Sequence, residues 1–121
     1  MILMLGDSTV GHMSIKSLLE SNGYIVRVAK TTDLAAVVLR CQKIDLILLD
    51  IELPDDISGI DYLKVLKSQA ETKDIPVIMV TSSHTSFDFI GDAAANGAVD
   101  YIIKPIAPSN LYEKVQAALS S

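Results

Sequence analysis

Four polar residues whose side chains together can bind a phosphoryl group follow apolar runs of the sequence. They are Asp7, Asp50, Thr81 and Lys104. The two aspartates offer the carboxylate oxygens that Mg²⁺ prefers, and this ion usually keeps several waters and a substrate phosphate. Lys104 and Thr81 offer a positive charge and a hydroxyl donor for phosphoryl oxygens. Aspartate can form acyl phosphates, and Asp50 is the candidate for taking the phosphoryl group covalently because it follows the most apolar of these runs.

These side chains can meet only if the apolar runs before them are parallel strands of one sheet. The runs are apolar on consecutive residues, which is typical of strands covered on both faces. The predicted strands are residues 2–5, 24–29, 46–49, 77–80 and 101–103, with the more polar 24–29 at an edge. Ligands of open parallel sheets bind at the carboxyl ends of the strands, so one rim is expected to carry all four side chains.

The segments between the runs show the helical spacing of apolar residues. Two stripes are the clearest and are predicted to face the core: Leu34, Val37, Val38 and Cys41, and Leu111, Val115, Ala118 and Leu119. Cys41 is expected to be a small buried hydrophobe. Weaker stripes are Ile15, Leu18 and Leu19, then Ile60, Leu63 and Leu66, and finally Phe87, Ile90 and Ala94 before a left-handed helix stop at Asn96-Gly97. Five helices alternating with five strands predict a doubly wound α/β fold.

Length and charge limit the other possibilities. The 121 residues predict one domain, residues 1–121, without a linker or repeat. Ten Lys and Arg against fifteen Asp and Glu give a net charge of −5, which argues against direct binding of nucleic acid or anionic membranes. Cys41 is the single cysteine, so an internal disulfide and a cysteine zinc site are excluded. The apolar run at residues 1–5 is too short for a signal peptide or a membrane span, which favours the cytoplasm.

The stretches around the four polar side chains resemble the receiver domain of bacterial two-component response regulators. They are ILMLGD at residues 2–7, DLILLDIELP at 45–54, PVIMVTS at 76–82 and GAVDYIIKP at 97–105. The stretches occur in the order of the family and the resemblance covers essentially the whole chain. It implies a flavodoxin-like five-stranded parallel sheet of strand order 2-1-3-4-5, with five helices on two faces.

The resemblance also implies a role for each residue of the phosphoryl site. Asp50 would accept the phosphoryl group from a sensor histidine kinase or a phosphotransfer protein. Asp7, Asp50 and the backbone carbonyl of Glu52 would hold Mg²⁺. Lys104 is similar to the lysine that pairs with the phosphoryl group in the family, and Pro105 to the proline after a cis peptide.

A switch is implied by the same resemblance. Thr81 is similar to the hydroxyl that moves to the phosphoryl group, and Tyr101 to the aromatic residue that turns inward with it. The surface of the fourth helix, fifth strand and fifth helix would then change its affinity for a partner, an output domain or a second copy. Such a domain is not an enzyme, although it assists its own phosphorylation and dephosphorylation. Both a stand-alone regulator and a receiver cut from a longer chain fit the sequence.

The sequence departs from the family pattern at two places. Gly6 stands where the family usually has the first of two acidic residues, so we expect Mg²⁺ to bind more weakly than in a receiver with both acids. The loop of residues 54–59 is one residue longer than usual and carries Asp55 and Asp56. These acids either lean toward the metal or form a solvated turn, and the turn is favoured.

A pseudo-receiver is the main alternative. It would keep the fold without phosphorylation and act as a protein interaction or dimerisation module, and Gly6 is its support. The retention of Asp50, Thr81, Lys104 and Tyr101 favours the phosphorylated switch. Two other classes fit poorly: a flavin binder would have an acid inside its phosphate loop at residues 6–11, and an aspartate-nucleophile phosphatase would need a threonine that is absent near Asp50.

Overall fold

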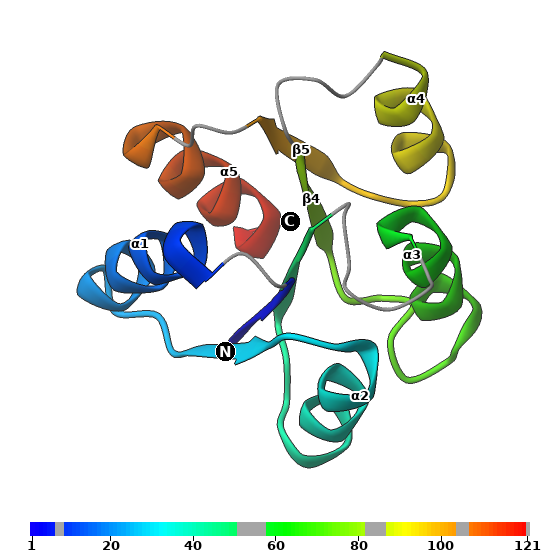
Figure 1. The fold of residues 1–121 in the computed structure, drawn as a ribbon, viewed down its shortest axis with the longest axis horizontal. Helices are drawn as coiled ribbons and strands as arrows, with labels where there is room; N and C mark the ends of the chain where they lie inside the picture. Colours follow the sequence, from blue (N-terminus) through cyan, green and yellow to red (C-terminus); the bar gives the residue numbers. More distant parts are fainter. Residues whose placement is uncertain (7–8, 51–57, 82–86, 104–106, 121) are drawn as a thin grey trace.

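The computed structural model describes residues 1–6, 9–50, 58–81, 87–103 and 107–120, and all of their side chains except those of 9–14, 81 and 87–90. Strands and helices alternate throughout (Figure 1). In chain order they are β1 (Ile2–Leu5), α1 (Thr9–Ser21), β2 (Val26–Ala29), α2 (Thr32–Cys41), β3 (Leu46–Asp50), α3 (Gly59–Ser68), β4 (Val77–Thr81), α4 (Phe87–Ala95), β5 (Asp100–Ile103) and α5 (Pro108–Ser120).

The strands form one parallel sheet in the order β2-β1-β3-β4-β5. The expected doubly wound α/β fold and its strand order are therefore confirmed. The more polar strand β2 lies at an edge, as predicted from its sequence. β3 lies at the centre, and each of its five residues is buried.

Each face of the sheet has its own hydrophobic core, which explains why the strands are apolar on consecutive residues. Leu3 and Leu5 of β1 join the core under α2, α3 and α4, whereas Ile2 and Met4 join the core under α1 and α5. Figure 1 shows α1 and α5 together on one side of the sheet. Side chains alternate between the two faces of a strand, so a strand covered on both faces must be apolar at every position.

Glycine ends two of the helices in the left-handed conformation. Gly97, with φ +105°, follows α4, and the N–H of Ala98 donates to the carbonyl of Ala93 at 3.0 Å. Gly23, with φ +91°, ends α1 with the same pattern of hydrogen bonds. These are Schellman motifs, in which glycine avoids the steric penalty of a positive φ. The predicted helix stop at Asn96-Gly97 is confirmed.

The predicted core face of α2 is wrong. Leu34 and Val37 are 51% and 54% exposed, and Cys41 is exposed too. Only Val38 of the predicted stripe packs partly against the core. The fully buried residue of the helix is Ala35, whose small side chain lets α2 lie close to the sheet beside its edge strand.

The other predicted stripes face the core, except that the stripe of α4 was assigned one residue too late. Buried members of the predicted stripes are Ile15, Leu19, Ile60, Leu63, Leu66, Leu111, Val115 and Ala118. In α4 the buried residue is Ala93, and the predicted Ala94 is exposed. One residue is a rotation of about 100° on a helix, so this error turns the assigned face away from the core. The side chains of Phe87 and Ile90 lie outside the described residues.

The connection from α3 to β4 is fixed by two polar side chains. Thr72 is buried and its hydroxyl donates to the carbonyl of Leu66. The ammonium of Lys67 donates to two carbonyls of the same connection, that of Ile75 at 2.8 Å. Burial lowers the pKa of Lys67, although the charge of Asp74 opposes that shift. These bonds satisfy backbone carbonyls behind the helix and position the start of β4.

The stability of the protein should depend on valine methyl groups in the buried sheet much more than on those at the surface. Val77 of β4 is fully buried, whereas Val99 is 55% exposed. We expect Val77→Ala to lower the free energy of unfolding by about 2–3 kcal/mol, because apolar contacts are lost and a cavity is left. Val99→Ala removes the same atoms and should change it by less than about 0.5 kcal/mol. Urea denaturation followed by circular dichroism measures both, and equal losses would contradict the assigned core.

Candidate functional site

Asp50 is the last residue of β3 and is only 7% exposed. Among the residues that the structure describes, no other acidic residue is buried. The strands on both sides of it end at nearly the same level: Leu5 pairs with Leu49, and Val80 pairs with Asp50. A buried carboxylate costs free energy unless positive charge or hydrogen-bond donors compensate it. The position therefore favours a carboxylate with a function over a surface turn residue.

Thr81 is the last residue of the neighbouring strand β4 and lies one step beyond the partner of Asp50. Its register partner on β5 is Ile103. The sheet thus brings Asp50 and Thr81 to the same edge on adjacent strands, as the apolar runs predicted. The side chain of Thr81 lies outside the described part of the structure.

Several residues assigned from the sequence also fall outside the described residues. They are Asp7, Glu52, Asp55, Asp56, Lys104 and Pro105. In the sequence these residues belong to the connections that follow β1, β3, β4 and β5. Their roles stay predictions.

Gly6 directly follows β1, beside the position of Asp50 on β3. It is buried, and its N–H donates to the carbonyl of Ala29 at 3.1 Å. The residue that replaces the expected acid thus extends the backbone pairing of β1 with β2. A side chain at this position would start next to the end of β3.

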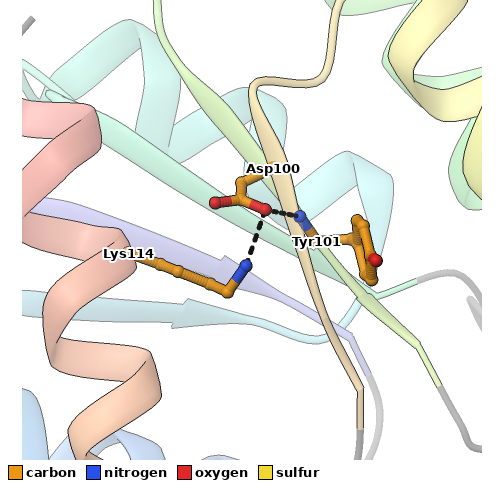
Figure 2. A network of polar contacts seen from close by, with 3 residues as sticks. All are labelled: Asp100, Tyr101 and Lys114. Carbon is orange, nitrogen blue, oxygen red and sulfur yellow. Dashed lines mark hydrogen bonds and ion pairs between the residues drawn. The ribbon is translucent and has the colours of Figure 1, made fainter.

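Tyr101 lies on β5 in a cluster with two charged residues that sequence reasoning missed. One carboxylate oxygen of Asp100 accepts hydrogen bonds from the ammonium of Lys114 at 2.7 Å and from the N–H of Tyr101 at 2.8 Å (Figure 2). The same ammonium lies 5.3 Å from the centre of the Tyr101 ring. A cation at this distance attracts the aromatic ring. Tyr101 is 36% exposed, so Lys114 of α5 helps to hold this residue at the surface.

The family of the chain follows from comparison with known proteins. A model of the response regulator receiver domain matches residues 2–116. The chain belongs to the response regulator receiver family. It is therefore a receiver domain of two-component signalling, a class of non-catalytic signalling domains, and this confirms the resemblance of the four sequence stretches.

Curated relatives and solved structures agree with this family. The receiver domain is 36% identical over 118 residues to the phosphate regulon transcriptional regulatory protein PhoB of Klebsiella pneumoniae, covering 98% of this chain and 51% of PhoB. The chain thus spans about half the length of that relative.

Two solved receiver domains superimpose closely on this one. The receiver domain of NtrX from Brucella abortus has a TM-score of 0.92 at 26% identity and covers 100% of this chain and 99% of its own. The receiver domain of sensor histidine kinase PA1611 from Pseudomonas aeruginosa has a TM-score of 0.86 at 27% identity, covering 99% and 97%. Its crystal structure contains a magnesium ion coordinated in the active site cleft.

Among the described residues of the receiver domain, no helix combines the length and apolar character that crossing a bilayer requires.

Loss of the Lys114 charge should free the ring of Tyr101. We expect Lys114→Met to remove about 0.5–1 kcal/mol of cation–π stabilisation, so that the ring samples more rotamers. Its aromatic NMR resonances should then move toward those of an unstructured tyrosine. Lys114→Arg keeps the cation and should leave them near their original positions. Unchanged resonances in Lys114→Met would show that the cation does not hold the ring.

Proposed function

We propose that Asp50 of this receiver domain accepts a phosphoryl group from a sensor histidine kinase or a phosphotransfer protein. The observation that carries this proposal is the buried carboxylate at the carboxyl end of the central strand β3, with Thr81 ending the adjacent strand. The family membership supports it, since the matching model covers this region completely. In this proposal, residues 1–121 act as one phosphoacceptor domain in the cytoplasm.

The transfer itself needs a nucleophile and charge compensation. A carboxylate oxygen of Asp50 attacks the phosphorus of a phosphohistidine, and a P–O bond forms while the P–N bond breaks and the imidazole leaves. The ammonium of Lys104 and the hydroxyl of Thr81 stabilise the phosphoryl oxygens. The same residues then assist hydrolysis of the aspartyl phosphate.

Magnesium fits the donor set of this site. Carboxylate and carbonyl oxygens are its preferred ligands, and Asp7, Asp50 and the backbone carbonyl of Glu52 would hold it. When bound, Mg²⁺ offsets the negative charge of the phosphoryl group. The magnesium ion in the cleft of the PA1611 receiver domain supports this assignment. Gly6 supplies no carboxylate, so we propose a weaker metal site.

Phosphorylation then changes the surface of α4, β5 and α5. Thr81 shifts toward the new charge and Tyr101 turns inward, away from the ammonium of Lys114. Val99, Tyr101 and Ile103 are exposed on or beside β5, so the affected surface contains apolar groups that a partner can cover. The partner is an output domain, another protein or a second copy, and nucleic acid and membranes are not bound directly.

Gly6 favours one alternative, a pseudo-receiver that binds partners without phosphorylation. Its missing carboxylate weakens the metal site on which phosphoryl transfer depends. The two functions differ in one observable: only the phosphoacceptor responds to a phosphoryl donor or analogue.

Beryllium fluoride with Mg²⁺ should change the receiver domain in the way that phosphorylation does. We expect a saturable shift of the amide NMR signals of Asp50, Thr81 and Tyr101, because the analogue adds negative charge beside the carboxylate. Asp50→Asn removes the attacking charge and should abolish the shift. Amide signals that stay unchanged up to tens of millimolar Mg²⁺ would instead support the pseudo-receiver.

Restoring the missing acid should strengthen the metal site. We expect Gly6→Asp to tighten Mg²⁺ binding about tenfold, because one more carboxylate offsets the charge of the ion. Gly6→Asn has nearly the same shape without the charge and is the matched control. Isothermal titration calorimetry measures all three proteins, with circular dichroism to verify the fold. Equal affinity in the original chain and Gly6→Asp would contradict a role of Gly6 in metal binding.

A further inference from the structure

The outer surface of α2 carries an exposed apolar stripe, which the described residues of the chain leave uncovered. Leu34 and Val37 are about half exposed, and Cys41 continues the stripe toward the end of the helix. Their spacing of three and four residues places them on one side of the helix. In Figure 1, α2 lies at the periphery of the molecule, over the edge of the sheet that ends with β2. The stripe is therefore accessible to another molecule.

A groove runs beside this stripe, between α2 and α3. It has a volume of about 850 Å³, and its apolar lining includes Ala36 and Leu39 of α2 and Tyr62 and Val65 of α3. Ridges of side chains on one helix commonly pack into such grooves on another. The surface thus combines a ridge and a groove, so the ridge of one copy can pack into the groove of a second copy and the reverse.

The charges of α2 match a second copy of the same helix. Asp33 lies in the first turn and Arg40 in the last, and both line the groove. Within the described residues, neither side chain has an ion-pair partner in its own chain. They are the charged residues of this helix, so α2 is locally neutral although the chain carries a net charge of −5.

Only one orientation of two α2 helices uses these charges. In an antiparallel pair, Asp33 of each copy faces Arg40 of the other. The positive end of each helix dipole then lies beside the negative end of the other, which is a favourable arrangement. Ala36 then faces Val37 near the two-fold axis, and Leu34 faces Leu39. A parallel pair would place like charges together. A two-fold contact must be complementary to itself, and this surface meets that condition.

We propose that the surface formed by α2 and the α2–α3 groove is a homodimer interface in which two α2 helices pack antiparallel around a two-fold axis beside Val37. The interface lies apart from α4, β5 and α5. Its formation does not require phosphorylation of Asp50, so the Asp50→Asn chain should dimerise like the original chain.

Charge reversal tests the orientation directly. Asp33→Arg gives α2 two positive charges, and Arg40→Asp gives it two negative charges. We expect each variant alone to dimerise about tenfold more weakly in sedimentation velocity, because like charges then face each other. A mixture of the two variants should form a heterodimer about as tight as the original homodimer, since every facing pair is again opposite. Both variants keep a net negative charge, so general attraction between the chains does not explain such a result.

Cysteine cross-linking tests the axis. A Val37→Cys, Cys41→Ser chain should form a disulfide-linked dimer on mild oxidation, because the two residues lie next to the axis. The original chain is the control: its two Cys41 residues would be about 13 Å apart along the helices, too far for a disulfide. Cross-linking through Cys41 but not through Val37→Cys would overturn the antiparallel arrangement.

The oligomeric state decides the proposal as a whole. A concentration-dependent dimer that Val37→Asp abolishes supports it, provided that circular dichroism shows an unchanged fold. A chain that stays monomeric at millimolar concentration would overturn it and leave this surface to a partner of another kind. Loss of the dimer would not affect the Asp50 response to beryllium fluoride, so the two proposals fail separately.

Discussion

The parallel pairing of β3 with β1 and β4 is the constraint on which the rest of the structure depends. All strands run in the same direction, so every connection crosses back over one face of the sheet as a helix. The carboxyl ends of the strands therefore meet at one edge. Asp50 stands at that edge with only 7% of its surface exposed, and a carboxylate so buried requires positive charge or hydrogen-bond donors to compensate it.

The fold class could be predicted from the sequence pattern because the sheet has a core on each face, whereas the strand order came from the resemblance to the family. Apolar residues at consecutive positions, as in residues 46–49, indicate a strand buried on both faces, and four of the strands were found in this way. The more polar β2 was predicted as an edge strand, and two of its four residues are exposed. The types of the site residues were equally visible, since Asp50 and Thr81 end adjacent strands. The roles of Asp7, Glu52 and Lys104 rest on the family, because strand-end spacing alone does not determine which atom binds a metal or a phosphoryl group.

The face of α2 could not be predicted from its pattern. The helix has apolar residues on both sides: Leu34 and Val37 are exposed, whereas Ala35 is fully buried and Val38 and Leu39 pack partly against the core. Spacing cannot choose between two apolar faces, and the stripe predicted from spacing lies mostly on the exposed one. The contact of Lys114 with Tyr101 was also invisible, because it joins a helix to a strand through side chains with no periodic relation. Both features that the pattern missed, the exposed face of α2 and the contact of Lys114 with Tyr101, lie at the surface of the domain.

Two surfaces have different proposed roles: α4, β5 and α5 respond to phosphorylation, whereas α2 joins two copies without it. The central claim is that Asp50 carries the phosphoryl group. The most direct test is to treat the chain with an acyl-phosphate donor and Mg²⁺, reduce it with borohydride, and map the peptides by mass spectrometry. Borohydride converts an aspartyl phosphate to homoserine, and the account predicts this change at residue 50, dependent on Mg²⁺. Homoserine at another aspartate, or none at any metal concentration, would contradict it.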